Sequence, residues 1–422
     1  MENKDIRART VKYRDKTWDL PEVDTKEYTH CFHTYPAMMI PQIARKLLKR
    51  YGVEGGWLLD PYCGTGTSLV EASLFGMHSV GCDINPLVRL IATAKLTPIP
   101  RRTLTAHLDT LNDCLFQVEF SDKVPEKPVP DVPNLAYWFS EEVIRSLAFL
   151  RAWIDEVEEE TVRNFLSVAF SETVRECSYT RNGEFKLHRM PAEKLADFQP
   201  DVFGIFRKKL SRNQHGLAMF MEKRQDVDAS VSCANTVSGE FPMPRPLGGY
   251  DIVVTSPPYG DSHTTVAYGQ FSRLAAEWLG LPNARKVDRL AMGGHPTDSK
   301  LTDSPVVAAI EKIRSVDEKR AQQVAAFYTD LGGSIHSVAK MLSSRATVCY
   351  VVGNRRVKGV MLPTDAFVIS EFSRYGFSHQ QTIVRNIPNK RMPHKNSPTN
   401  VAGKTAATMN EENIVVCERT NL

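Results

Sequence analysis

Residues 251–260 place a short apolar strand directly before a proline-rich loop. An apolar run of this length is typical of a buried parallel strand. The two prolines remove backbone donors and fix the direction in which the chain leaves the sheet. The loop therefore presents a hydroxyl, carbonyl groups and an aromatic ring at the carboxyl end of a strand, where open α/β sheets bind ligands. A proline turn that only ends a core strand is the alternative. The candidate catalytic residues are Ser256, Pro257, Pro258 and Tyr259.

A second motif, at residues 57–86, has the order strand, glycine turn, helix and strand. Glycine lets the backbone approach a ligand closely, and Asp83 at the tip of the second strand can accept both hydroxyls of a ribose. The turn lacks the third glycine of a dinucleotide site, because Leu69 stands there, and it lacks the lysine of a P-loop. Asp60 would repel a pyrophosphate but attract an ammonium group. These features predict S-adenosylmethionine as the ligand, with an ordinary βαβ turn capped by Asp60 as the alternative.

The two motifs resemble those of the bacterial DNA amino-methyltransferases, which methylate the exocyclic nitrogen of cytosine or adenine. Residues 60–67 are similar to that family's cofactor loop and residues 255–259 to its catalytic loop. Residues 33–37 resemble the segment that closes over the methionine end of the cofactor. Residues 387–393 resemble a late loop of cytosine-N4 members. This similarity of sequence pattern reaches both ends of the chain, but it fades between about residues 105 and 225.

The motifs and the resemblance together define a candidate cofactor site, and S-adenosyl-L-methionine is the expected cofactor. Its predicted residues are Tyr35, Pro36, Asp60, Tyr62, Cys63, Gly64, Thr65, Gly66, Thr67, Asp83, Ile84 and Asn235. The Pro257 carbonyl and the Ser256 hydroxyl would each accept one amino proton, while Tyr259 would stack on a base that has left the duplex. Attack on the sulfonium methyl then needs orientation more than strong acid–base catalysis. Methylation of cytosine C5 is not expected, because the chain has no Pro-Cys dipeptide.

The first residue of the catalytic loop bears on the target base. Family members with Ser at this position usually act on cytosine N4, and those with Asp or Asn on adenine N6. Ser256 therefore predicts a site-specific DNA methyltransferase acting on cytosine N4, with adenine N6 as the alternative. A methylase of guanine N2 in RNA and a catalytically silent DNA-binding subunit are further alternatives that the intact motifs disfavour. Double-stranded DNA is the expected partner, and a cognate restriction endonuclease acting on the same site is a candidate second partner.

Composition adds limits rather than a function. The formal charge of the 422 residues is only +4, so any contact with DNA phosphates must come from local basic clusters. Solvated helix faces are the alternative for each cluster. The predicted DNA contacts are Arg181, Arg207, Lys208, Arg355, Arg356, Lys390 and Arg391. Eight scattered cysteines without a Cys-x-x-Cys pair predict neither zinc nor a disulfide framework. Neither a signal peptide nor a membrane-spanning stretch is recognisable, and the cysteine usage fits a reducing setting, so the cytoplasm is the expected location.

The order of elements predicts an α/β fold: a Rossmann-like, S-adenosylmethionine-dependent methyltransferase sheet with a largely helical insertion. Residues 1–105 are expected to form the N-terminal segment and cofactor half, 106–226 an inserted helical or target-recognition region, and 227–422 the catalytic half. About 185 residues separate the cofactor turn from the catalytic strand, far more than one crossover needs. The insertion is expected to recognise the target sequence, or else to serve as a helical support.

Overall fold

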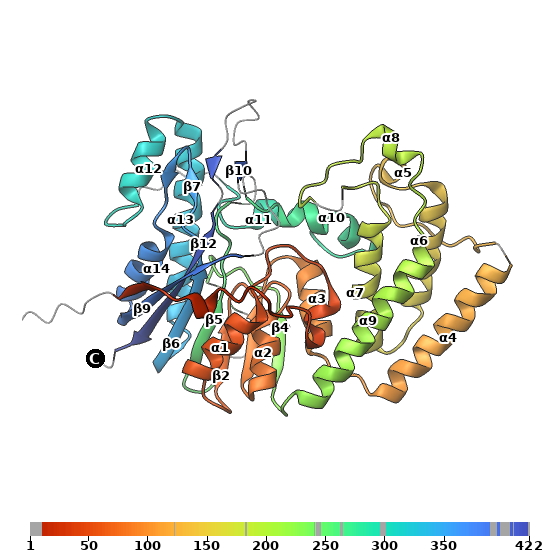
Figure 1. Cartoon of the computed structure of the whole chain (residues 1–422), viewed down its shortest axis with the longest axis horizontal. Coiled ribbons are helices and arrows are strands. Elements are labelled where there is room, and N and C mark those ends of the chain that lie inside the picture. The colour runs from red at the N-terminus through yellow and green to blue at the C-terminus, as the bar shows by residue number, and fades with distance from the viewer. Residues whose placement is uncertain are drawn as a thin grey trace, which may run out of the picture.

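The centre of the protein is a mixed eight-stranded sheet of order β1-β9-β12-β6-β5-β2-β3-β4 (Figure 1). The computed structural model describes residues 11–121, 123–181, 184–239, 241, 246–261, 265–295, 301–388, 395–396, 406–407 and 409–420. The strands of the sheet are β1 (Lys12–Arg14), β2 (Trp57–Asp60), β3 (His78–Cys82), β4 (Ala229–Ser232), β5 (Tyr250–Thr255), β6 (Leu342–Val352), β9 (Phe377–Asn386) and β12 (Glu411–Arg419). Two short two-stranded sheets lie outside it: β7 (Arg356–Val357) with β8 (Val360–Met361), and β10 (Lys395–Asn396) with β11 (Ala406–Ala407).

The strand order reverses between β2 and β5, which pair in parallel through Leu58↔Ile252 and Leu59↔Val253. From β2 the chain builds outward to β3 and β4, and from β5 it builds the other way to β6. Strand β12 is antiparallel to both of its neighbours, β6 and β9. Ligands bind at such a reversal, beyond the carboxyl ends of the strands. This arrangement confirms the predicted Rossmann-like α/β fold and places the cofactor and catalytic motifs side by side.

Helices cover both faces of the sheet, which explains why its central strands are almost wholly apolar. Alternate residues of β2 and β5 enter different cores: Leu58 and Ile252 pack in one cluster, and Leu59 and Val253 in the other. The first cluster includes α1 (Pro41–Tyr51), α2 (Thr67–Phe75), α3 (Pro86–Leu96) and α10 (Tyr268–Trp278). The second is formed with α12 (Val307–Arg314), α13 (Glu318–Ala339) and α14 (Thr364–Ser373).

Between β3 and β4 the chain forms the predicted helical insertion, which stands beside the sheet beyond α3 (Figure 1). Its helices are α4 (Arg101–Phe120), α5 (Leu135–Trp138), α6 (Glu141–Asp155), α7 (Glu160–Glu176), α8 (Ala192–Leu195) and α9 (Val202–Lys223). Phe165 and Phe170 of α7 belong to the same apolar cluster as Leu58 of the sheet. The insertion therefore shares a core with the cofactor half, and the predicted boundary at residue 106 falls inside α4.

The segment before α1 contains the short helices η1 (Lys16–Trp18) and η2 (Tyr28–Phe32), and α11 (Val287–Leu290) follows α10. Within the described part of the chain, no helix is both long and apolar enough to cross a membrane.

Candidate cofactor and catalytic site

A cavity lies where β2, β3 and β5 end, and it brings together motifs that are almost 200 residues apart in the chain. Most of the predicted cofactor residues line it, and so do two members of the catalytic loop. The predicted residues in its lining are Tyr35, Pro36, Asp60, Tyr62, Cys63, Gly64, Thr65, Thr67, Asp83, Ile84, Asn235, Ser256 and Pro258. Gly66, Pro257 and Tyr259 are not in that lining.

The glycine turn between β2 and α2 depends on backbone conformations that side chains disfavour. Gly64 and Gly66 have φ of 48° and 79°. A Cβ at Gly66 would lie 3.0 Å from the Cβ of Ala92, so Gly66 lets α2 begin close against α3. A Cβ at Gly64 would meet no protein atom within 4 Å. The backbone at Gly64 is therefore open towards the cavity, whereas Gly66 has a packing role behind it.

Asp60, the last residue of β2, is a buried carboxylate at the floor of the cavity. One oxygen accepts hydrogen bonds from the Tyr62 backbone amide (3.2 Å) and the Thr255 hydroxyl (2.6 Å), and the other accepts one from Ser68. Burial raises the pKa of Asp60 to about 6, although these hydrogen bonds oppose the shift. A cation entering the cavity would restore the charged form, so the site favours a ligand with a positive group.

Asp83 follows β3 and is the second acidic residue of the cavity. Its carboxylate accepts backbone hydrogen bonds from Gly64 (3.2 Å) and Asn85 (2.8 Å), which fix it beside the glycine turn. Burial raises the pKa of Asp83 as well. The described residues that line the cavity include these two carboxylates and no Lys, Arg or His. Such a lining suits a sulfonium, an ammonium and a ribose, and it is unsuited to a pyrophosphate.

Aromatic and amide groups that the sequence analysis did not single out complete one wall. Tyr268 stacks on Tyr35 with ring centroids 6.1 Å apart and planes 10° apart. The Asn85 side chain donates to the Tyr35 hydroxyl (3.0 Å) and to Ser272 (2.8 Å). Asn85 also caps the N-terminus of α3. The Asn-Pro pair after Asp83 is a recognisable helix start, but the contact with α10 depends on the tertiary structure.

The catalytic loop leaves β5 with the Ser256 hydroxyl in contact with β6 and with Tyr259. Ser256 Oγ lies 3.1 Å from the Val351 carbonyl and 3.3 Å from the Tyr259 hydroxyl. The Tyr259 hydroxyl donates to Glu412 of β12 (2.9 Å). Burial and the Glu412 charge raise the pKa of Tyr259 well above its usual value. Tyr259 is thus held by its hydroxyl, and its predicted stacking on a base stays a prediction.

The end of the loop is fixed by a buried charge cluster. Asp261, which is fully buried, pairs with Arg320 of α13 (3.0 Å) and with Arg355 (3.1 Å). The Arg355 guanidinium crosses Gly260 so closely that a Cβ there would lie 2.2 Å from its Cζ. Gly260 also has a φ of 153°. The prediction that Arg355 contacts DNA phosphates does not fit its place, because its charge is buried and paired.

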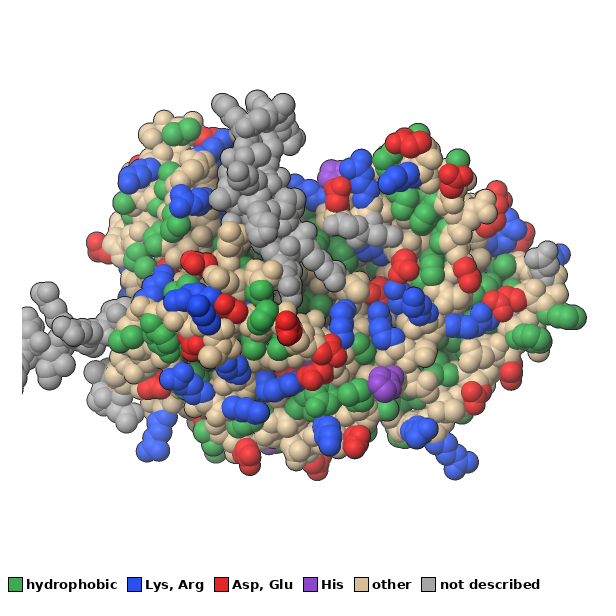
Figure 2. Space-filling model, viewed as in Figure 1, with side chains coloured by type: hydrophobic (Ala, Val, Ile, Leu, Met, Phe, Trp, Pro, Cys, Tyr) green, Lys and Arg blue, Asp and Glu red, His purple; other side chains and the backbone are tan. Residues whose placement is uncertain are grey.

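The other predicted DNA contacts differ in their surroundings. Arg207 forms a two-bond ion pair with Glu119 (2.8 and 2.6 Å), so it serves to join α9 to α4 rather than to offer a free cation. Lys208 and Arg356 are exposed, and Arg181 has a half-exposed side chain that pairs with Glu184 (3.1 Å). Lys390 and Arg391 lie outside the described residues. Figure 2 shows Lys and Arg side chains spread among Asp and Glu over the visible face rather than in one patch.

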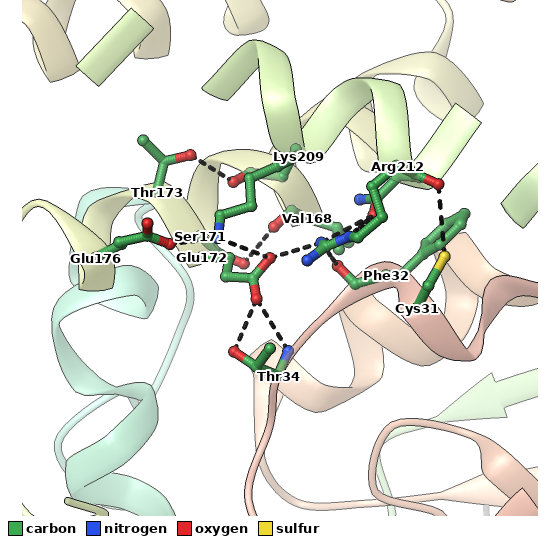
Figure 3. A network of polar contacts seen from close by, with 12 residues as sticks. Cys31, Phe32, Thr34, Val168, Ser171, Glu172, Thr173, Glu176, Lys209 and Arg212 are labelled. Atoms are coloured by element: carbon green, nitrogen blue, oxygen red, sulfur yellow. Dashed lines mark hydrogen bonds and ion pairs between the residues drawn. The ribbon is translucent and has the colours of Figure 1, made fainter. Parts of the chain in front are cut away.

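A polar network joins the segment before Tyr35 to two helices of the insertion (Figure 3). Glu172 of α7 accepts hydrogen bonds from the Thr34 amide (3.1 Å) and hydroxyl (2.7 Å) and from Arg212 of α9 (2.6 Å). Arg212 also donates to the Phe32 carbonyl (2.8 Å). Burial would raise the pKa of Glu172, but the charge of His33 and the hydrogen bond and charge of Arg212 lower it to about 2. The insertion therefore positions the segment that carries Tyr35 and Pro36.

The comparisons with known proteins agree with this geometry. A family model described as a DNA methylase matches residues 1–93. A type II methyltransferase of Kocuria varians, M.MvaI, is 40% identical over 418 residues, which cover 93% of this chain and 91% of that protein. The chain belongs to the type II DNA amino-methyltransferases. This methyltransferase uses S-adenosyl-L-methionine, and the acidic cavity without a cation is consistent with that cofactor.

Two shorter matches concern parts of the methyltransferase only. The type II methyltransferase M.MjaII of Methanocaldococcus jannaschii is 38% identical over 84 residues, 19% of this chain and 16% of that protein. A tRNA (guanine(10)-N2)-dimethyltransferase of Methanothermobacter thermautotrophicus is 48% identical over 52 residues, 12% of this chain and 16% of that protein. A match of this length leaves most of the chain without a counterpart, so it does not support the RNA alternative.

Proposed function

We propose that this DNA amino-methyltransferase transfers the methyl group to N4 of a cytosine that has rotated out of the duplex. The observation that carries the proposal is the position of Ser256, which lines the same cavity as Asp60 and Asp83. Ser at this loop position is typical of cytosine-N4 members of the family. Adenine N6 is the alternative, because Ser256 can accept a proton from either amine.

The chemistry follows from the nature of an aromatic amine. Its lone pair is delocalised into the ring, so the nitrogen needs orientation and removal of a proton to act as a nucleophile. Ser256 Oγ would accept one amino proton, and the Pro257 carbonyl would accept a hydrogen bond from the other. S-adenosylmethionine, when bound, would supply an electrophilic methyl group to the amine nitrogen. Asp60 and Asp83 would hold the ammonium and the ribose, and Pro36, Ile84 and Asn235 would complete the enclosure.

We propose DNA contacts at the exposed basic residues Arg181, Lys208 and Arg356. Each would neutralise a phosphate and release counterions, so that the affinity would depend on salt. The insertion that carries Arg181 and Lys208 is proposed to take part in recognising the target sequence. A restriction endonuclease that cuts the same site is proposed as a biological partner, in keeping with the type II relatives.

Nucleoside analysis tests the target base. Plasmid DNA from a host free of other methylases is treated with the protein and S-adenosylmethionine, digested to nucleosides and analysed by mass spectrometry. The proposal expects N4-methylcytosine and unmodified deoxyadenosine. Detection of N6-methyldeoxyadenosine instead would show that the target is adenine N6. Sequencing the same DNA with a method that detects modified bases would give the recognition site.

A further inference from the structure

A continuous hydrogen-bonded chain leads from the catalytic loop away from the cavity. Ser256 Oγ lies 3.3 Å from the Tyr259 hydroxyl, which donates to Glu412 Oε1 at 2.9 Å. Ser256 lines the cavity, whereas Glu412 belongs to β12, on the far side of β6 from the catalytic strand. These hydrogen bonds thus connect the expected position of the substrate amine to Glu412, a carboxylate that is not part of the catalytic motif.

Arg385 fixes this carboxylate from the neighbouring strand. Glu412 and Arg385 are direct partners in the pairing of β12 with β9, and their side chains form an ion pair. The Arg385 guanidinium is buried and also donates to the carbonyls of Trp18 (2.7 Å) and Asp19 (3.1 Å). Glu412 is therefore held in one orientation, with Oε2 towards Arg385 and Oε1 towards Tyr259.

Methylation of an amine must release one proton. As the C–N bond forms and the S–CH₃ bond breaks, the cation on sulfur is neutralised and the nitrogen must lose hydrogen. Ser256 has no other titratable partner among its described contacts, since its second neighbour is the Val351 carbonyl (3.1 Å). A hydroxyl that accepts a proton must pass one on, and the only onward hydroxyl in those contacts belongs to Tyr259.

We propose that Ser256, Tyr259 and Glu412 form a proton relay in which Glu412 is the final acceptor. The amine N–H bond breaks as Ser256 Oγ takes the proton, Ser256 gives its own to Tyr259, and Tyr259 gives its own to Glu412. Both hydroxyls end neutral, Glu412 ends protonated, and the positive charge lost at sulfur balances the negative charge lost at the carboxylate. This inference rests on the proposed transfer to an amine and holds for cytosine N4 and adenine N6 alike.

The surroundings of Tyr259 agree with a relay rather than with ionisation. Burial and the facing carboxylate keep its pKa high, so Tyr259 releases a proton only as it receives one. A Cβ at Gly353 would lie 3.0 Å from the Tyr259 ring, so this glycine lets the ring lie close to the end of β6. Glu412 is not among the residues that line the cavity, and it acts through Tyr259 as a positioning and proton-accepting residue.

Two substitutions separate proton transfer from mere support of the loop. Glu412→Gln keeps the shape of the side chain and an oxygen that accepts from Tyr259, but it cannot take the proton. Tyr259→Phe keeps the ring and removes the hydroxyl from the chain. Single-turnover transfer of a tritiated methyl group to plasmid DNA is measured with cofactor and DNA both saturating. We expect each variant to slow transfer about 10²-fold, the usual scale for losing a proton acceptor, with unchanged dissociation constants for cofactor and DNA.

The double variant and a neighbouring residue supply the controls. Because both changes break one relay, the double variant should be no slower than either single variant. Glu411→Gln, at the exposed residue before Glu412, should transfer at the wild-type rate.

Wild-type enzyme that leaves DNA unlabelled would refute the proposed function itself. Wild-type labelling with Glu412→Gln within threefold of the wild-type rate would overturn the relay alone. Should Glu412→Gln fail to fold, Tyr259→Phe decides: a rate within threefold of wild type at unchanged affinities overturns the relay, and a loss of about 10²-fold supports it.

Discussion

Thr255, the last residue of the catalytic strand, donates a hydrogen bond of 2.6 Å to Asp60, the last residue of the cofactor strand. The two residues are 195 positions apart in the chain and adjacent in the sheet. Through this bond the end of β5 stabilises the charged form of a carboxylate of the cavity, and the next residue of the same loop, Ser256, lines that cavity as well. The catalytic and cofactor motifs are therefore joined directly and not only by their common cavity.

Replacing Thr255 by Val should weaken cofactor binding. The substitution keeps the side-chain volume but removes a hydrogen-bond donor from the buried Asp60 carboxylate. Leaving a buried acceptor without its donor costs about 1–3 kcal/mol of free energy. The pKa of Asp60 should rise further, because a hydrogen bond that lowers it is lost. Calorimetry of S-adenosylmethionine binding at pH 7 measures the effect. Thr255→Ser, which retains a hydroxyl, is the matched control, and equal affinities of the two variants would refute the role of this bond.

The affinity for the cofactor should increase as the pH rises from 5 to 7. Asp60 has a pKa of about 6, so it is mainly protonated below that value and presents a carboxylate to the ammonium group above it. The raised pKa also affects the stability of the protein without cofactor. Because the folded state prefers the protonated form of Asp60, the free energy of unfolding falls as the pH rises from about 4 to about 6. Asp60→Asn should remove the step in affinity near pH 6. A dissociation constant that changes equally with pH in both proteins would contradict this assignment.

The Glu172 network should stabilise both the fold and the cofactor site. Glu172→Gln removes a buried charge that faces Arg212 and Lys209, and breaking such a pair costs about 3 kcal/mol. Since Glu172 has a pKa of about 2, lower than the usual 4.5, its contribution is complete above about pH 4.5 and is lost as the pH falls through 2. Urea unfolding at pH 7 measures the loss. Glu176→Gln, at a more exposed partner of Lys209, should cost less than about 1 kcal/mol.

Replacing Gly260 by Ala should lower methyl transfer without affecting cofactor binding. The new Cβ would meet the Arg355 guanidinium, which is held by Asp261, and the backbone conformation there disfavours any side chain. The catalytic loop must therefore shift. The glycine turn between β2 and α2 is a separate segment, so we expect it to keep its conformation. Gly332→Ala, inside α13 with no atom closer than 3.5 Å to the added Cβ, is the control and should leave transfer unchanged. A fully active Gly260→Ala variant would show that the close contact is unimportant.

Local patterns were sufficient to predict the central strands of the sheet and most of the residues that line the cavity, but not the edge strand β1. Asp60, Asp83 and Ser256 each end or follow a strand, and the carboxyl ends of parallel strands meet at one edge, so short motifs could be placed together. Helix α4 was not predicted, although Leu104, Leu108, Leu111 and Leu115 repeat with helical spacing and are buried. The nearby prolines and the polar residues between the leucines obscured that pattern.

The roles of the basic residues could not be predicted from the sequence. Arg355 and Arg356 are neighbours with the same charge, yet one is buried against Asp261 and the other is exposed. Arg385 likewise lies in a basic segment but pairs with Glu412 inside the sheet. Which cation faces solvent depends on the acidic partner that the fold supplies, and that partner is distant in the chain.

A comparison of the wild-type protein with Ser256→Ala tests most directly whether residues 255–260 are the place of methyl transfer. Binding of S-adenosylmethionine is measured by calorimetry, and transfer of a tritiated methyl group to plasmid DNA by counting the label in the DNA. We expect that the wild type labels DNA, and that Ser256→Ala binds the cofactor with the same affinity but transfers almost no label. A Ser256→Ala variant that labels DNA at the wild-type rate would contradict the assignment of this loop as the place of methyl transfer.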